Sequence, residues 1–198
     1  MTSYDPAQFT RGFDEMRRIL AAAWQKDLVA GFSGNASLKL ADGNILLTAK
    51  GAAKGRLLPS QVCIATPEGK PLAGAPASSE AGMHYALYAA RPDCGAILHT
   101  HPPFLLALAM LSADMAGFLK LPLFEADVFR KKLAIAPALS PGTQELALAV
   151  AEAAEAPRIS AVWMSGHGLC AFGGTLDEAL ALTEEYEHLA RVALLAQG

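Results

Sequence analysis

Hydrophobic residues recur at helical spacing near the start of the chain, where Phe13, Met16 and Leu20 lie three or four residues apart. Asp5 followed by Pro6 is typical of a helix start, because an aspartate side chain caps the first turn and proline fits its first position. We therefore predict an amphipathic helix from this cap to about residue 26.

Short apolar stretches and turn residues follow this helix. Residues 37–40 and 45–48 flank Asp42-Gly43, a pair that favours a tight hairpin between two strands. Residues 62–65 form a further apolar run, which the turn at Pro67-Glu68-Gly69 ends. The pattern predicts three short strands in this part of the chain.

Helical and extended patterns alternate from residue 78 onward. We predict helices over 78–90, with Ser78 or Ser79 as the cap, 104–111, 142–155 and from the capping box at 175–178 almost to 198, and strands over 95–101, 161–164 and 169–172. Residues 121–135 are ambiguous, with strand-like pieces at either end. Helices placed between and around strands indicate an α/β sandwich with a central mixed or antiparallel sheet. No repeat or linker divides the chain, so we predict a single domain over residues 1–198.

Composition narrows the class of protein. The chain has 198 residues, of which 53% are hydrophobic and 18% charged, and its net charge is −3. This balance indicates a well-filled core and gives no basis for nucleic-acid binding. The N-terminus lacks a signal-peptide pattern and no segment reaches the length of a membrane span, so we predict a cytoplasmic protein. The scattered Cys63, Cys94 and Cys170 are interpreted as buried free thiols.

His99-Thr100-His101 lies at the end of a predicted strand. Alternate strand residues point to the same face, so the two imidazoles project together while Thr100 points away. Imidazole is the commonest protein ligand for zinc, and two on one face can share an ion. Two ordinary polar residues at a strand end would give the same pattern, so the motif needs support from elsewhere in the chain.

His167 supplies part of that support. It stands in Ser165-Gly166-His167-Gly168, where the flanking glycines leave room for a close approach and permit an unusual backbone angle. We interpret it as a third ligand, against the alternative of a turn histidine at the surface. His188, among the glutamates of the last helix, is instead predicted to be solvated.

Glu80 supplies the rest. It lies four residues before His84, on the same helical face, and its helix leads through a short turn into the His99 strand. A solvated pair on the helix surface is the alternative. Three histidines with a nearby carboxylate leave a coordination position open, as in catalytic rather than structural sites. The prediction is one catalytic divalent metal, zinc.

Three loop or helix-start segments are rich in small hydrogen-bond donors: residues 34–35, 48–51 and 78–79. Backbone N–H groups at a helix start favour an anion, although each segment alone is also ordinary turn chemistry. Lys50 and Lys54 can bring positive charge to the same place. Beside a metal, these segments indicate a small phosphorylated substrate.

The combination of motifs resembles the class II aldolase/adducin family, and its L-fuculose-phosphate aldolases in particular. The motifs, in order, are Gly34-Asn35-Ala36-Ser37, Thr48-Ala49-Lys50-Gly51, Ser78-Ser79-Glu80 with His84, His99-Thr100-His101-Pro102 and Gly166-His167-Gly168. The resemblance covers almost the whole chain. It implies a three-layer α/β/α sandwich with a largely antiparallel central sheet covered by helices, assembled as a homotetramer with active sites at the subunit interfaces.

The resemblance also implies residue roles. Zinc, one ion per subunit, would be held by His99, His101 and His167. Glu80 would coordinate the resting metal and transfer the proton during catalysis. The substrate phosphate would be held by four residues: Asn35, Gly51, Ser78 and Ser79. Zinc would stabilise the enediolate that is left when the C3–C4 bond of a ketose 1-phosphate breaks.

Two features depart from the family's aldolases. Lys50 replaces a small hydroxyl residue, so it either strengthens phosphate binding or occupies the pocket. Those aldolases also carry a C-terminal extension with a tyrosine that closes over the site, whereas this sequence stops at Gly198. The group that protonates the departing aldehyde is therefore unassigned, with Glu125 and Asp127 of a neighbouring subunit as candidates.

An aldolase that releases dihydroxyacetone phosphate and an aldehyde is the first hypothesis. A lyase similar to methylthioribulose-1-phosphate dehydratase is the second, because the loop at residues 48–57 resembles that subgroup's. A phosphopentose 4-epimerase is a third. A structural adducin-like module, which lacks the metal site, is disfavoured by the intact histidines and Glu80.

Overall fold

The computed structural model describes residues 4–111 and 120–196. Within these ranges the chain forms one sheet of eight strands in the order β4-β3-β2-β1-β5-β8-β7-β6. The strands are β1 (Asn35–Lys39), β2 (Ile45–Thr48), β3 (Val62–Ala65), β4 (Pro71–Gly74), β5 (Ala96–Thr100), β6 (Leu133–Ala136), β7 (Ala161–Met164) and β8 (Gly168–Gly173). Of the neighbouring pairs, β6 and β7 run parallel and the other six run antiparallel. The predicted largely antiparallel sheet is confirmed.

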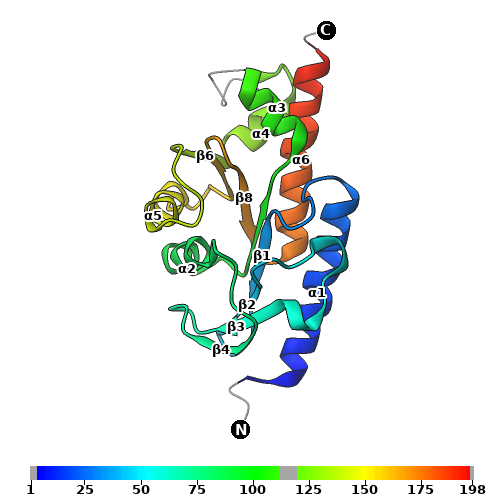
Figure 1. Cartoon of the computed structure of the whole chain (residues 1–198). Helices are drawn as coiled ribbons and strands as arrows, with labels where there is room; N and C mark the ends of the chain where they lie inside the picture. Colours follow the sequence, from blue (N-terminus) through cyan, green and yellow to red (C-terminus); the bar gives the residue numbers. More distant parts are fainter. Residues whose placement is uncertain (1–3, 112–119, 197–198) are drawn as a thin grey trace.

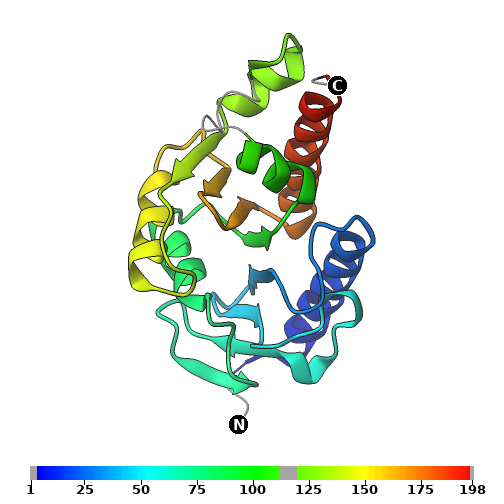
Figure 2. The same cartoon turned by 45° about the horizontal axis from the view of Figure 1, so that its top comes forward.

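Helices cover both faces of this sheet, as Figure 1 shows. The helices are α1 (Pro6–Gln25), α2 (Ala81–Ala90), α3 (Pro103–Leu111), α4 (Phe124–Arg130), α5 (Gln144–Ala153) and α6 (Leu176–Leu195). Helices α2 and α5 lie on one side of the sheet and α1 and α6 on the other, while α3 and α4 lie beside the C-terminal part of α6 (Figures 1 and 2). The predicted three-layer α/β/α sandwich is therefore confirmed, and a single domain over residues 1–198 stays a prediction.

The central strands are buried on both faces. Leu46 of β2 and Leu98 of β5 belong to the core under α1 and α6, whereas their neighbours Leu47 and Ile97 belong to the core under α2 and α5. All four side chains are fully buried. Burying one such side chain contributes about 1.5–3 kcal/mol, so unbroken apolar runs are favoured in strands that helices cover on both sides.

Side-chain caps begin the two long helices as predicted. The Asp5 carboxylate accepts a hydrogen bond from the Ala7 N–H at 2.9 Å, with Pro6 in the first turn. Thr175 Oγ1 accepts from the Glu178 N–H at 3.2 Å. The return bond of the predicted capping box differs, because Glu178 accepts from the N–H of Gly174 rather than that of Thr175.

Helix α2 begins later than predicted. Its N-cap residue is Glu80, and no side chain caps it. Ser78 Oγ instead accepts a hydrogen bond from the Glu80 N–H at 3.3 Å, in the turn before the helix. The expectation that Ser78 or Ser79 caps the helix is wrong, and the turn places Glu80 at the start of α2.

Two other segments differ from the sequence prediction. The first part of the ambiguous segment, residues 124–130, is helix α4, and its last part alone is a strand, β6. Strand β4 was not predicted, because Pro71 and Gly74 both disfavour strands. It lies at the edge of the sheet, where proline is tolerated.

The three cysteines are buried free thiols, as predicted. Burial raises the pKa of Cys63 and that of Cys94 to about 11, so both thiols stay protonated at neutral pH. Across the described ranges, no helix has both the length and the apolarity that a membrane crossing requires.

Candidate metal and catalytic site

Three histidines meet where β5 ends and β8 begins. His99 lies within β5, His101 follows that strand, and His167 lies in the turn between β7 and β8. Because β5 pairs antiparallel with β8, with His99 opposite Cys170, the turn that precedes β8 reaches the end of β5. The ring centroid of His99 lies 4.7 Å from that of His101 and 4.7 Å from that of His167. The predicted convergence of the three rings is present.

The ring nitrogens of this group can face a single ion. One nitrogen from each histidine lies within 4.8 Å of those of the other two. His99 Nδ1 lies 3.0 Å from the carbonyl oxygen of Leu169 and donates to it, so Nε2 carries the lone pair. His99 Nε2 is buried without a hydrogen-bond partner in the described part of the chain. Buried nitrogens without partners are costly unless they bind something else.

Glu80 completes the group. Its Oε2 lies 3.4 Å from His99 Nε2, and its Oε1 lies 3.2 Å from His167 Nε2. Ligand atoms bound tetrahedrally to zinc at about 2.0–2.1 Å lie about 3.3 Å from one another. The two measured distances match that separation, so the carboxylate and imidazoles fit a shared metal ion.

Two histidines of the group, His99 and His101, are held in the neutral form. Burial lowers the pKa of His101 to about 4, with the neighbouring His167 ring and Lys54 adding to the effect. Burial, followed by the two neighbouring imidazoles, lowers the pKa of His99 well below its ordinary value. Neutral imidazole is the form that binds metals. The environment therefore favours ligation over surface solvation.

The glycines around His167 have different tasks. A Cβ added at Gly168 would lie 2.4 Å from the Thr100 carbonyl oxygen and 2.6 Å from His101 Cδ2, so the end of β5 and the His101 ring leave no room for a side chain here. Gly166 has open space around it, but its φ of 71° lies in the left-handed region. Both roles expected of the glycines are present, one at each position.

We expect Gly168→Ala to weaken metal binding by about 10- to 100-fold, because the added methyl group displaces His101. Zinc titration followed by thermal unfolding measures the effect. Gly166→Ala is the matched control, for which we expect a stability loss of about 1 kcal/mol from its φ but unchanged zinc affinity. Equal zinc affinity in both variants would contradict the role of Gly168.

The segments expected to hold a phosphate lie side by side. The backbone of Ala49 pairs with that of Ala77, and the Ser78 N–H donates to the Thr48 carbonyl at 3.1 Å. Gly51, with a φ of 72°, and Ser79 are exposed, while Ser78 is half-buried. The two loops that carry Gly51, Ser78 and Ser79 are therefore adjacent. Contact of these residues with a phosphate stays a prediction.

Asn35 differs from the other three residues. Its side chain is 2% exposed, and its Nδ2 donates to Glu80 Oε2 at 2.8 Å. Its Oδ1 contacts His84 Nε2. Both polar atoms of the Asn35 side chain therefore have protein partners. Binding of a phosphate by this residue stays a prediction.

The two lysines of the predicted anion pocket occupy different environments. Lys50 is exposed, whereas Lys54 is 2% exposed and donates from Nζ to the carbonyl oxygens of Phe32 at 2.7 Å and Ala52 at 2.8 Å. Burial lowers the pKa of Lys54 to about 8, and the negative charge of Glu80 opposes that shift. Lys54 therefore brings a cation within electrostatic reach of the Glu80 carboxylate.

The model of the class II aldolase and adducin N-terminal domain matches residues 14–194. The chain belongs to the class II aldolase and adducin family. The predicted resemblance is confirmed, and so is the prediction of an enzyme of the lyase type rather than a structural module. The three histidines of this family member form a group that can hold a metal ion.

Relatives in the family carry several activities. This chain is 32% identical over 183 residues to 3-oxo-tetronate 4-phosphate decarboxylase of Escherichia coli K12, covering 92% of this chain and 85% of the relative. It is 32% identical over 178 residues to L-fuculose phosphate aldolase of Methanococcus vannielii, covering 90% and 93%. It is also 32% identical over 180 residues to methylthioribulose-1-phosphate dehydratase of Gluconacetobacter diazotrophicus, covering 86% and 88%.

A solved structure agrees with the fold. A sugar-phosphate aldolase from Thermotoga maritima superposes with a TM-score of 0.84 at 25% identity, covering 96% of this chain and 97% of that one. The class II aldolase fold thus extends over nearly all of both chains. The three relatives have different activities, yet each is 32% identical to this chain. Sequence identity therefore does not distinguish among the three reactions.

Other candidates lie away from the class II aldolase site. Glu125 and Asp127, on α4, are exposed, and Asp127 pairs with Arg130. They are absent from the described histidine group, so their expected role in a neighbouring subunit stays a prediction. His188 is exposed on α6, as predicted.

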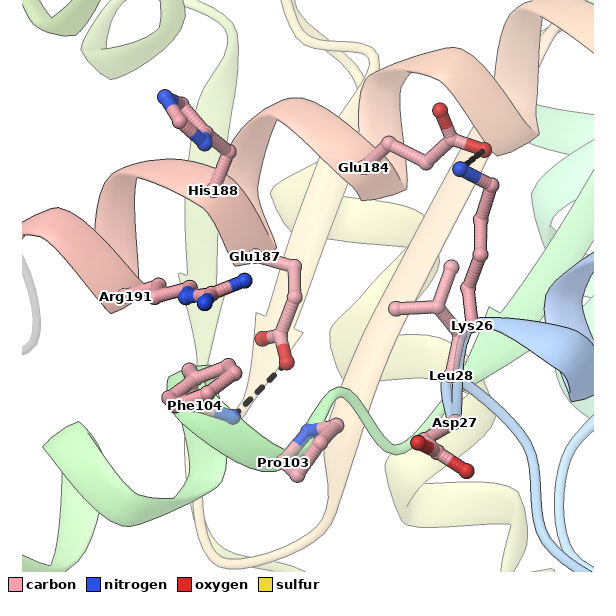
Figure 3. Close-up of a pocket in the computed structure, with 9 residues that line it drawn as sticks. All are labelled: Lys26, Asp27, Leu28, Pro103, Phe104, Glu184, Glu187, His188 and Arg191. Atoms are coloured by element: carbon pink, nitrogen blue, oxygen red, sulfur yellow. Dashed lines mark hydrogen bonds and ion pairs between the residues drawn. The ribbon is translucent and has the colours of Figure 1, made fainter.

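A cavity of about 310 Å³ lies between the end of α1, the start of α3 and α6. Figure 3 shows the residues that line it. Glu187 accepts from the N–H groups of Phe104 and Leu105, each at 2.9 Å, and thereby caps α3. Lys26 pairs with Glu184 at 3.6 Å across the opening. The polar groups in this cavity therefore fasten α3 and α1 to α6, and none of the three histidines lines it.

Sequence reasoning missed the surroundings of His84. His84 is fully buried, not solvated as the alternative for the Glu80–His84 pair supposed, and its Nδ1 lies 2.7 Å from Ser37 Oγ. The signal was present in the sequence. Ser37 lies two residues after Asn35 on one face of β1, and Tyr88 lies four residues after His84 on one face of α2.

Proposed function

We propose that this protein is a zinc-dependent lyase that reversibly cleaves a ketose 1-phosphate into dihydroxyacetone phosphate and an aldehyde. The observation that carries the proposal is the meeting of three histidines with Glu80, whose oxygens lie 3.2 and 3.4 Å from two ring nitrogens. A site of this kind suits reactions that leave negative charge beside a carbonyl group.

Zinc is the proposed ion because the donor set consists of nitrogen and carboxylate ligands. His99, His101 and His167 would hold it, and Glu80 would join them in the resting state. Zinc bound there would act as a Lewis acid for the substrate oxygens. Buried ligand atoms without other partners support this assignment.

Glu80 is the proposed acid and base. In aldol cleavage, the C4 hydroxyl loses its proton, the C3–C4 bond breaks, and its electron pair stays on C3 until a proton arrives there. A carboxylate at the start of α2, 11% exposed and beside the ligands, is placed to move that proton. The hydrogen bond from Asn35 Nδ2 holds one of its oxygens in place.

The substrate phosphate is proposed to bind at Gly51, Ser78 and Ser79, with Asn35 as the fourth residue of the set. Support comes from the adjacent backbones of residues 48–51 and 76–79, the open space at Gly51 and the accessible Ser79. Buried Lys54 would contribute positive charge to the same region. Exposed Lys50 leaves the pocket free and can reach toward a bound anion.

Decarboxylation of a 3-oxo sugar acid phosphate is the second candidate, favoured by the decarboxylase relative. Loss of carbon dioxide from 3-oxo-tetronate 4-phosphate leaves an electron pair on C2, beside the C3 carbonyl. The remaining three-carbon fragment is the same one that aldol cleavage of a ketose 1-phosphate leaves. One arrangement of metal, Glu80 and phosphate site can therefore serve either reaction. The two reactions differ in the group that leaves, which is an aldehyde in aldol cleavage and carbon dioxide in decarboxylation.

The test incubates zinc-loaded protein with ketose 1-phosphates, a 3-oxo-tetronate 4-phosphate and a methylthioribulose 1-phosphate. We expect dihydroxyacetone phosphate and an aldehyde in equal amounts from a ketose 1-phosphate. Carbon dioxide with dihydroxyacetone phosphate from the sugar acid alone would instead establish the decarboxylase. A diketo phosphate that keeps all its carbons would establish the dehydratase, and turnover of none would overturn the proposal.

We also propose that the enzyme works in the cytoplasm as a homotetramer with active sites at the subunit interfaces. Large exposed apolar side chains support a partner surface, notably Phe124 at 92%, Met110 at 87% and Leu111 at 71% exposure. Exposed apolar surface is the kind of surface that a partner subunit covers. The mass of the protein in solution tests the assembly separately from the reaction.

A further inference from the structure

A line of buried polar side chains runs from α2 to Glu80. The Tyr88 hydroxyl lies 2.9 Å from Ser37 Oγ, which lies 2.7 Å from His84 Nδ1. His84 Nε2 contacts Asn35 Oδ1, and Asn35 Nδ2 lies 2.8 Å from Glu80 Oε2. The four residues behind Glu80 are at most 4% exposed. They form one continuous chain whose end is the proposed catalytic carboxylate.

The chemistry of each group fixes the direction of these hydrogen bonds. An ionised carboxylate accepts only, so Asn35 must donate from Nδ2 and must present Oδ1 to His84. Because Oδ1 only accepts, the ring proton of His84 must lie on Nε2. Nδ1 is then unprotonated and accepts from Ser37, whose oxygen in turn accepts from Tyr88.

The histidine has a single ring proton to give. Burial lowers the pKa of His84 to about 3, so its ring is neutral at physiological pH. A neutral ring cannot donate in both directions, so a ring that donates from Nε2 to Asn35 must accept at Nδ1 from Ser37. Every side-chain polar atom of Tyr88, Ser37, His84 and Asn35 has a hydrogen-bond partner in this arrangement, and leaving one without a partner is costly in a buried site.

We infer that His84 is a positioning residue: together with Ser37 and Tyr88, it fixes the Asn35 amide so that Nδ2 always donates to Glu80. The inference rests on the proposed function, because Glu80 is the catalytic group that it serves. If the amide turned over, Asn35 would present an oxygen to the carboxylate, and the two oxygens would repel. Glu80 would then lose the contact that holds it beside the histidines.

Two replacements of His84 separate positioning from packing. Glutamine is one carbon longer than asparagine, so its amide nitrogen can reach the place of His84 Nε2 and donate to Asn35, whereas asparagine reaches only the place of Nδ1. We expect His84→Asn to lower kcat by about 10- to 100-fold with little change in KM or zinc content. His84→Gln is expected to restore most of that loss.

Zinc content and melting temperature are measured for both variants, with kcat and KM on whichever substrate the panel reveals. Equal kcat in the two variants and the wild type would overturn the inference. An equal loss in both, with equal melting temperatures, would do the same, because the donor to Asn35 would then be irrelevant.

A second measurement needs neither turnover nor a folded His84 variant. In the ¹⁵N spectrum of histidine-labelled protein, we expect His84 to carry its proton on Nε2. Ser37→Ala removes the donor to Nδ1, so we expect the ¹⁵N shift of Nδ1 to change while the proton stays on Nε2, where Asn35 Oδ1 accepts it. An Nδ1-protonated ring in the wild type would overturn the inference even if the reaction proposal stands. Failure of every substrate would overturn the reaction proposal, and the spectrum would still decide the direction of the chain.

Discussion

His99→Ala is expected to abolish zinc retention and to lower kcat/KM by at least about 1000-fold. His99 is fully buried at the centre of the group, and its ring contacts those of both other histidines. Its Nε2 faces Glu80 without a hydrogen bond. A Lewis acid supplies several kcal/mol of transition-state stabilisation, and each 1.36 kcal/mol corresponds to about a tenfold change in rate.

The measurement is metal content after dialysis, followed by turnover with added zinc. His188→Ala is the matched control, because His188 is exposed on α6 and absent from the metal group. We expect wild-type metal content and turnover from that variant. Retention of one zinc per subunit by His99→Ala would remove His99 from the ligand set and would refute the site as drawn.

The convergence of the three histidines was predictable because local geometry determines most of it. Strand periodicity places His99 and His101 on one side of the chain, and the glycines around His167 mark a position that tolerates close approach. The layered fold followed in the same way from apolar runs in the strands and from caps such as Asp5 and Thr175. Each of these signals depends on only a few neighbouring residues, so it can be recognised in the sequence.

Contacts between distant segments were harder to predict. Glu80 and His84 share a helical face, and the sequence permitted a solvated pair there. In the structure their side chains are joined through Asn35, which comes from β1. Pairing of β1 with β5, which sets Asn35 opposite His99, brings that amide between them. Such a contact depends on sheet order, which no local pattern specifies.

Helix α4 is a second feature that depends on packing between distant segments. Residues 124–130 contain Phe124, Val128 and Phe129, which favour strands as isolated residues. In the structure Ala126 is buried against the α6 side of the core, while Phe124 is 92% exposed. The helix of residues 124–130 therefore follows from packing of Ala126 against the α6 side of the core, which outweighs the strand propensity of its neighbours.

Glu80→Gln is expected to retain zinc and to lose kcat by about 100- to 10,000-fold, the usual contribution of a general acid or base. Glutamine has the same size as glutamate, and its carbonyl oxygen can still accept the hydrogen bond from Asn35 Nδ2. His99, His101 and His167 remain to hold the ion. The amide cannot take up or release a proton near neutral pH, so proton transfer alone is removed.

The result is informative because Glu80 is proposed both to bind the metal and to move a proton, and the two roles predict different outcomes. Zinc content near one per subunit with lost turnover assigns the proton. Lost zinc and lost turnover together would make Glu80 chiefly a ligand, since three histidines would then be too weak to retain the ion. Glu184→Gln, the same change in a carboxylate that pairs with Lys26 outside the site, controls for charge alone and should alter neither quantity. Near-normal turnover in Glu80→Gln would move the acid–base role to another residue, and the hydrogen-bond chain from Tyr88 would then end on a group with no part in proton transfer.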